Sequence, residues 1–379
     1  MTSNINYLCI DDQADCTIDQ LLGRIESGGG ISLERWTPTG LDSILPRIKA
    51  FIDAHQSSGA GLLLDLRLDM DSDQAKERVN YRGPTLAQEL RTRMAEGEIA
   101  PAPIVLWSVN SKFKSSYSNE DTSHDLFDDV YEKDREIIEN PAVVASRLVS
   151  LAKGYKALHK SSGTSMALSL LSLGSDIDSM LYAQFLDEYK ELFDKRSVHD
   201  IARFILNDLV RVQGLLVGEK LLAARLGVDI ELSGNSWIVI KSALQSSSYA
   251  GPFCEGWNRW WWYKVEDWWF DLFGDKYDLR GISSSDRIAL LNSKFDVELT
   301  PATSITEGYS TNFFTLCAGT GRPLDPHDGL RVVCRGARDW HDPAYVSIYA
   351  ALERIGRGVK WRLDPLERQR LDAIKEELG

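Results

Sequence analysis

The sequence predicts an α/β fold, with a doubly wound parallel sheet in the N-terminal part and a mainly α-helical domain after it. Three observations lead to this prediction. Over residues 5–155, short apolar runs of strand length alternate with stretches of helical periodicity. One run, Leu62–Leu66, is apolar except for Asp65, as in strands that helices cover on both faces. Polar side chains follow the ends of these runs, where the functional crevice of such sheets lies.

The first two strand–helix units can be placed from the apolar pattern. Tyr7–Ile10 has strand length, and apolar residues at helical spacing follow over residues 18–25. The glycines Gly28–Gly30 end that helix. Ile31–Trp36 predicts a second strand, and residues 41–52 predict a second helix.

Three more units follow in the same order. Leu62–Leu66 is the third strand, and a helical stripe covers residues 86–94. Ile104–Trp107 predicts the fourth strand, and residues 130–131 predict a weak fifth. The last helix begins at Asn140–Pro141, an N-cap residue followed by proline in the first turn. Five such units predict a five-stranded parallel sheet.

Reactive side chains stand at four of the five predicted strand ends. They are Asp11 and Asp12 after the first strand, Asp65 in the third, Ser108 after the fourth and Lys133 after the fifth. Crowded carboxylates need a cation, and oxygen ligands favour Mg²⁺. A carboxylate can attack a phosphoryl group to form an acyl phosphate, while a lysine and a hydroxyl hold the phosphoryl oxygens. The pattern therefore predicts phosphoryl transfer to an aspartate.

In the order and placement of these groups, residues 5–155 resemble the receiver domain of response regulators in two-component signalling. The resemblance implies a flavodoxin-like sheet, and phosphorylation of Asp65 by a histidine kinase or a phosphotransfer protein. It also implies that Ser108 and Lys133 contact the phosphoryl group. The segment Gly83–Leu86 is similar to the glycine-led start of the third receiver helix.

The resemblance also assigns the magnesium ligands. They are the carboxylates of Asp11, Asp12 and Asp65 and the backbone carbonyl of Arg67, with Asp12 favoured over Asp11 as a direct ligand. The only chemistry implied is phosphorylation and dephosphorylation of the receiver itself, so we do not expect a separate enzymatic activity.

Three features depart from the receiver pattern. The loop Asp69–Asn80 is long and acidic, and Asp134 stands where a proline usually follows the lysine. The aromatic residue expected three positions before Lys133 falls on Val130, with Tyr131 one place away. These departures keep open a second hypothesis, in which an unphosphorylated receiver serves as a protein scaffold.

The C-terminal part contains no motif of a named family. A stretch of serine, glycine and threonine begins at Ser161 and predicts a linker. We therefore expect a receiver domain at residues 1–160 and an output or interaction domain at residues 161–379. Helical periodicity extends over residues 166–245.

A tryptophan-rich segment is a candidate interface. Trp257, Trp261 and Trp268 repeat at helical spacing. Tryptophans fill cores and also anchor protein interfaces, so a core helix and a partner-binding face both fit the pattern. Stacking of nucleic-acid bases is a weaker alternative, because few cations lie nearby.

Two further hypotheses concern this part of the chain. Residues 221–244 resemble a helix-turn-helix, but Asp229–Ser236 is long and acidic for its turn, so we favour a packed helical hairpin over a DNA-binding regulator. Residues 300–345 contain His327, His341 and several aspartates. These side chains could form the site of an effector enzyme, but we favour a solvated polar loop.

Composition limits the partners. The net charge is −13, and nucleic-acid binding relies on cationic contacts with phosphates, so DNA and RNA are disfavoured. The 5 cysteines include no CxxC pair, which predicts reduced thiols. No apolar run approaches the ~20 residues that cross a bilayer, and the N-terminus has no signal-like segment. We expect a cytoplasmic protein without membrane contact.

Together these features predict a response-regulator-like signalling protein. Phosphorylation of Asp65 would bias a two-state surface that controls the C-terminal domain. That domain would act by binding another protein, and a homodimer is one arrangement open to it.

Overall fold

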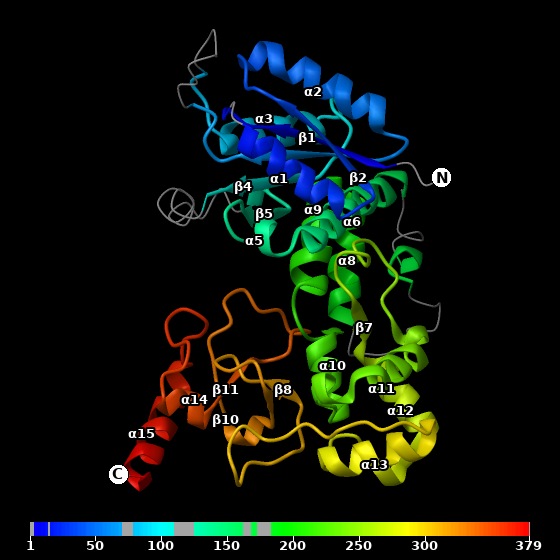
Figure 1. Cartoon of the computed structure of the whole chain (residues 1–379), viewed down its shortest axis with the longest axis vertical. Helices are drawn as coiled ribbons and strands as arrows, with labels where there is room; N and C mark the ends of the chain where they lie inside the picture. Colours follow the sequence, from blue (N-terminus) through cyan, green and yellow to red (C-terminus); the bar gives the residue numbers. More distant parts are fainter. Residues whose placement is uncertain are drawn as a thin grey trace. The chain divides into compact units, whose positions relative to one another are not determined.

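The computed structural model of the chain describes residues 4–13, 16–69, 79–109, 125–161, 168–172 and 183–378 (Figure 1). The chain forms two compact units. The first consists of Met1–Val210 and Ala250–Trp257, and the second of Arg211–Tyr249 and Asn258–Gly379. Within the described ranges, no helix is both long and apolar enough to cross a membrane.

The first unit is built on a five-stranded sheet in which all neighbouring strands are parallel. The strands are β1 (Ile5–Ile10), β2 (Ile31–Trp36), β3 (Ala60–Asp65), β4 (Ile104–Ser108) and β5 (Asp129–Glu132). Their order is β2-β1-β3-β4-β5, so the direction of winding reverses between β1 and β3. The prediction of an α/β, doubly wound sheet is confirmed, including its weak fifth strand. In such sheets a crevice opens at the reversal, outside the carboxyl ends of the strands.

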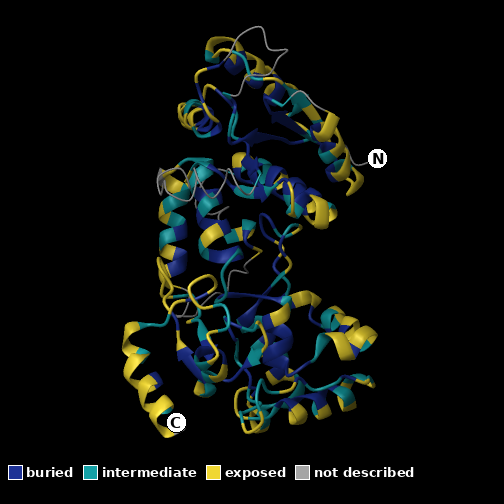
Figure 2. Cartoon of the chain, turned by 60° about the vertical axis from the view of Figure 1, so that its left-hand side comes forward, coloured by how far each residue is buried: buried dark blue, intermediate teal, exposed yellow. Residues whose placement is uncertain are grey.

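Helices cover both faces of this sheet. They are α1 (Cys16–Ser27), α2 (Leu41–His55), α3 (Gly83–Ala95), α5 (Glu136–Glu139) and α6 (Pro141–Lys160). Helices α2 and α3 share a core with Leu64 and Leu106. Helix α6 lies on the other face, where the Tyr7 hydroxyl donates to the Leu148 carbonyl at 2.7 Å, and Figure 1 shows α2 and α6 on opposite sides of the strands. Because both faces are covered, the three central strands β1, β3 and β4 are almost entirely buried, as Figure 2 shows.

Further helices complete the first unit. They are α8 (Ala183–Lys195), α9 (Val198–Ile205) and the π-helical turn η3 (Leu206–Val210). Helix α9 begins with a capping box, in which the hydroxyl of Ser197 accepts from the Asp200 N–H and the Asp200 carboxylate accepts from the Ser197 N–H. Helix α9 packs against α6. The first compact unit therefore continues beyond residue 160, where we expected the domain boundary. The expected linker after Ser161 lies outside the described residues.

A buried ion pair joins α3 to the start of β5. Arg91 Nη2 lies 2.7 Å from Asp128 Oδ2, and the two side chains are 7% and 0% exposed. Asp128 also accepts hydrogen bonds from the Tyr155 hydroxyl at 2.6 Å and the Ile104 N–H at 2.8 Å. His199 Nδ1 lies 2.8 Å from the same Tyr155 hydroxyl. The network thus connects helices α3, α6 and α9 to one edge of the sheet.

The second unit combines helices with short antiparallel strand pairs. Its helices are α10 (Glu219–Leu226), α11 (Ile230–Ala243), α12 (Trp262–Phe273), α13 (Ser284–Phe295), α14 (Ile348–Leu352) and α15 (Arg368–Leu378), with 3-10 turns at η4 (Gln245–Ser247), η5 (Asp275–Tyr277), η6 (Pro326–Asp328) and η7 (Pro365–Glu367). Its strand pairs are β6 (Leu216–Gly218) with β7 (Arg259–Trp261), β8 (Thr315–Leu316) with β9 (Pro323–Leu324), and β10 (Gly329–Arg331) with β11 (Tyr345–Ser347). One apolar core involves α10 to α13, and another involves β9 to β11 with α14 and α15.

The expectation of a mainly helical C-terminal domain does not hold between Phe295 and Ile348, although helices α14 and α15 follow this stretch. The structure describes all residues from Asp296 to Ser347, and their regular structure consists of short strands and one 3-10 turn. Glycine and proline recur through this stretch, and both residues favour turns over helices. The helical prediction was therefore too broad.

The connection between helices α10 and α11 is shorter than the sequence predicts, because α10 ends at Leu226 and α11 begins at Ile230. Gly227 ends α10 in the left-handed conformation, with φ 79°, and Asp229 caps α11 by accepting from the Leu232 N–H at 3.0 Å. The prediction of a long turn at Asp229–Ser236 is wrong, because Asp229 is the N-cap of α11 and the residues after it are helical apart from a break at Gly234. The break changes the direction of the helix, so the apolar spacing is interrupted there.

The three tryptophans singled out above do not share a helix. Trp257 precedes β7, Trp261 ends β7, and only Trp268 lies in α12. Trp257 is 8% exposed and Trp261 is 1% exposed. Trp268 is half-buried and stacks on Phe295, with ring centroids 5.9 Å apart. Of the three side chains, only Trp268 keeps an appreciable exposed surface.

Candidate metal centre

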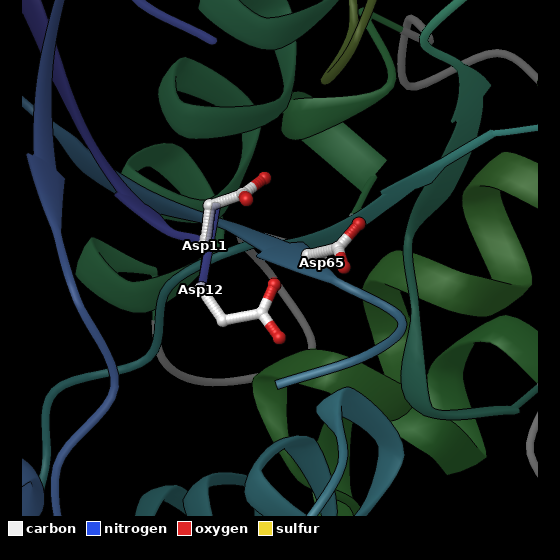
Figure 3. Close-up of side chains that lie close together, drawn as sticks. All are labelled: Asp11, Asp12 and Asp65. Atoms are coloured by element: carbon white, nitrogen blue, oxygen red, sulfur yellow. The ribbon is translucent and has the colours of Figure 1, made fainter. Parts of the chain in front are cut away.

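Three aspartates meet at the carboxyl ends of two neighbouring strands. Asp11 and Asp12 follow β1, and Asp65 is the last residue of β3. Each offers a carboxylate oxygen within 4.8 Å of the others, and Figure 3 shows the three side chains gathered at this edge. They are 0%, 6% and 4% exposed, respectively. The sequence prediction that these acids lie together is confirmed, and they lie at the winding reversal between β1 and β3.

Lys133 joins two of the acids. Its Nζ lies 2.6 Å from Asp11 Oδ2 and 2.7 Å from Asp65 Oδ1, and the lysine side chain is 4% exposed. Burial lowers the pKa of Lys133, but the neighbouring carboxylates of Asp65 and Asp11 outweigh burial and raise the pKa overall. Lys133 is therefore held as a cation. Three carboxylates and one ammonium leave an excess of negative charge, which a divalent cation would neutralise.

Asp65 differs from an ordinary aspartate. Burial raises its pKa to about 6, a rise that Asp11 reinforces and Lys133 opposes. Its Oδ2 accepts from the Arg67 N–H at 3.0 Å, and its Oδ1 is bonded to Lys133. The carboxylate is thus held at both oxygens. A bound cation would favour its charged form, which is the nucleophilic form.

Arg67 is close to Asp65 through its backbone. The Arg67 N–H donates a hydrogen bond to the Asp65 carboxylate. The role of its carbonyl as a metal ligand stays a prediction.

Ser108 offers a free donor beside this site. It ends β4, the strand next to β3, and it is 1% exposed. Its carbonyl accepts from the Lys133 N–H at 2.9 Å. Within the described part of the chain, its hydroxyl has no hydrogen-bond partner. Buried hydroxyls are normally paired, so an unpaired one at a cluster of acids suggests a group that bonds to a ligand.

Gly83 is the residue that lets the chain pass close to Asp65. It begins α3, and a Cβ atom at this position would lie 2.3 Å from the Asp65 carbonyl oxygen. That contact is with backbone, which cannot rotate away. The glycine-led start of this helix is therefore required by the packing around Asp65.

Gly83→Ala is expected to destabilise the first unit by about 1–3 kcal/mol, the usual cost of forcing extra atoms into a packed site. Hydrogen exchange of β3 and α3 peptides at increasing urea would measure the change. Gly23→Ala is the matched control, because Gly23 lies within α1 and a Cβ there meets nothing within 4 Å. That control should be neutral or slightly stabilising. Equal effects of the two variants would contradict the packing argument.

Sequence reasoning missed Trp107. Its ring lies under Lys133, with Nζ 4.5 Å from the ring centroid, and it is fully buried. Trp107 pairs in register with Asp65 across β3 and β4. Since a cation over an aromatic face is stabilised, this ring helps hold Lys133 in place. The sequence shows Trp107 only as one more apolar strand residue.

The polar residues of the 300–345 region do not form a second centre. Asp342 Oδ2 lies 2.6 Å from Arg225 Nη2, and Asp325 caps η6 by accepting from the His327 N–H. Asp328 accepts from the Ser310 N–H at 2.7 Å. Among the described residues, only Asp11, Asp12 and Asp65 form a group of three potential metal ligands. The hypothesis of a metal-dependent effector site in this region gains no support.

Comparisons with known proteins assign this chain to no family. No model of a protein family matches the chain, and no curated protein matches its sequence.

Proposed function

We propose that this chain is a response-regulator-like signalling protein, in which a histidine kinase or a phosphotransfer protein phosphorylates Asp65. One observation carries the proposal: a buried acidic triad whose members Asp11 and Asp65 are bridged by Lys133. The strand order supports it, because β2-β1-β3-β4-β5 is the order of flavodoxin-like sheets. That order is the one expected of a receiver domain.

The phosphoryl transfer uses Asp65 as nucleophile. One carboxylate oxygen attacks the phosphorus of a phosphohistidine, the phosphorus–nitrogen bond breaks, and the imidazole leaves with the electron pair. The Arg67 N–H keeps the carboxylate oriented. Lys133, already on Asp65 Oδ1, and the unpaired hydroxyl of Ser108 then donate to the phosphoryl oxygens.

The residues present fit a magnesium ion. Asp11, Asp12 and Asp65 would hold it, with the carbonyl of Arg67 as a further ligand, and all are oxygen donors of the kind that Mg²⁺ prefers. When bound, the ion offsets negative charge on the phosphoryl oxygens during transfer. The excess of carboxylates over ammonium groups at the site favours this assignment.

The output of this switch is the binding of another protein. We place the exchange in the cytoplasm, between a kinase and the first unit, with the second unit contacting the downstream partner. A homodimer would be one such contact. Charge added at Asp65 would shift the population of two surface states, and the partner would bind one of them.

A second candidate is a scaffold with an unphosphorylated receiver. One observation favours it. Tyr131, the aromatic residue one place from the expected switch position, is buried, and its hydroxyl donates to Asp129 at 2.7 Å. An aromatic side chain fixed in this way does not respond readily to a charge at Asp65. In this case Asp65→Ala would leave partner binding unchanged.

Intact-mass analysis after incubation with acetyl phosphate and Mg²⁺ tests the leading proposal. We expect one phosphoryl adduct on the wild type and none on Asp65→Asn. Asp69→Asn is the control, because Asp69 lies four positions further along the chain and outside the triad. It should keep the adduct. A wild type without adduct, or an Asp65→Asn variant that still forms it, rules out phosphorylation of Asp65.

A further inference from the structure

A hollow lies at the end of the parallel sheet opposite the acidic triad. It has a volume of about 400 Å³ and is formed near the amino ends of β3 and β4, between the end of α2 and the last turns of α6. The acidic triad is at the carboxyl ends of the strands, so the two sites do not share residues. Small-molecule sites commonly have volumes of roughly 300–1,000 Å³, and this hollow falls within that range.

The floor of the hollow is apolar, and most of its residues are small. Ala60 and Ala102 line it from the strand ends, Ala152 lines it from α6, and Ile52 lines it from α2. All four are buried. The short side chains of the three alanines leave the space open, and an apolar floor favours a ligand with a hydrocarbon or aromatic body.

The rim of the hollow is basic. Lys156, His159 and Lys160 line it from α6, and the residues lining it include no aspartate or glutamate. Lys156 Nζ donates to the Ser57 carbonyl in the turn after α2, so one ammonium is fixed at the rim. A rim that carries cations and no carboxylates attracts a negatively charged group.

We propose that this hollow binds a small organic anion, with its apolar body on the alanine floor and its negative group at Lys156, His159 and Lys160. The negative group is a carboxylate, a sulfonate or a phosphate, all of which accept hydrogen bonds from ammonium groups. This proposal does not depend on phosphorylation of Asp65.

Binding of 8-anilino-1-naphthalenesulfonate to the full chain tests the proposal. This probe combines an aromatic body with one negative charge, and calorimetry should show saturable binding with one site per chain. N-phenyl-1-naphthylamine, which lacks the sulfonate, should bind at least several-fold more weakly. Competition then identifies the preferred negative group. Displacement of the probe by benzoate indicates a carboxylate on an apolar body, and displacement by inorganic phosphate indicates a phosphate.

Two variants locate the site. Ala100→Leu places a larger side chain in the hollow from a partly exposed loop position, and it should weaken binding more than tenfold. Lys160→Gln should weaken binding about three- to fivefold, as expected for an exposed ion pair. Lys49→Gln is its matched control, an exposed lysine on α2 that pairs with Asp53, and it should leave affinity unchanged.

The outcomes separate ligand binding from a purely structural role. Basic residues in the last turn of α6 also stabilise the helix end, and in that role Lys160→Gln would change stability without changing affinity. Wild-type protein that shows no saturable one-to-one binding would overturn the proposal. So would an Ala100→Leu variant that is folded, as judged by circular dichroism, and binds the probe as tightly as the wild type.

Discussion

Asp128→Ala is expected to destabilise the first unit by about 3–5 kcal/mol, the usual cost of removing one partner of a buried ion pair. Arg91 would then keep its charge in the interior, because its side chain is 7% exposed. The Tyr155 hydroxyl and the Ile104 N–H would lose an acceptor in the same change. Urea titration monitored by hydrogen exchange of β4 and β5 peptides measures the effect without assuming that both units unfold together.

Asp125→Ala is the matched control for this variant. Asp125 lies three positions before Asp128, its side chain is 64% exposed, and it pairs with Arg203. An exposed pair of this kind contributes less than about 1 kcal/mol. If Asp125→Ala and Asp128→Ala destabilised the protein equally, burial of the Arg91 pair would not be the cause.

The stability that Asp128 contributes to the first unit should decrease at low pH. Burial alone raises the pKa of this carboxyl group, but the charge of Arg91 and the hydrogen bonds from His199 and Tyr155 outweigh it, so the pKa is well below its usual range. A lowered pKa contributes stability above the unfolded value of about 4, and this contribution is lost as the pH falls further. The difference between wild type and Asp128→Ala should therefore stay constant from pH 7 to 5 and shrink below pH 4.

Asp65→Asn is expected to abolish the phosphoryl adduct and to stabilise the metal-free fold by about 1–3 kcal/mol at pH 7. Burial raises the pKa of Asp65 to about 6, so the folded state disfavours the charged carboxylate, at about 1.4 kcal/mol per pKa unit. An amide in the same place carries no charge to bury. Functional sites commonly reduce stability in this way.

Urea unfolding in EDTA and in Mg²⁺ tests this expectation. In EDTA, the stability of the wild type relative to Asp65→Asn should increase as the pH falls from 7 through about 6, because the folded state binds the proton more tightly. In Mg²⁺, the wild type should gain stability and Asp65→Asn should gain less. A variant less stable than the wild type in EDTA would show that the bonds from Lys133 and Arg67 outweigh the cost of burying the charge.

The sequence predicts the acidic site well because its geometry follows from topology. The carboxyl ends of parallel strands meet at one edge, so acids at the ends of β1 and β3 must be neighbours once the strand order is right. Leu62–Leu64 shows that β3 is buried on both faces without any knowledge of its partners. The position of Asp11, Asp12 and Asp65 at strand ends was therefore enough to predict that they lie together.

Other features depend on contacts that leave no local signal. Arg91 and Asp128 are 37 residues apart, and neither stands in a motif. The ring of Trp107 reaches Lys133 because of the register between β4 and β5, which periodicity does not specify. The helical break at Gly234 interrupts the apolar spacing of α11, and this interruption looks like a loop in the sequence.

The short segment Ala250–Trp257 has a consequence for how this protein can be divided. It belongs to the first unit, although the chain on both sides of it belongs to the second. Lys153 pairs with Glu255 at 2.6 Å, and a Cβ at Gly154 would meet the Phe253 ring at 2.2 Å. The polypeptide therefore passes between the units at three points. Recombination at a single junction could not exchange either unit intact, so the two units are expected to be inherited together.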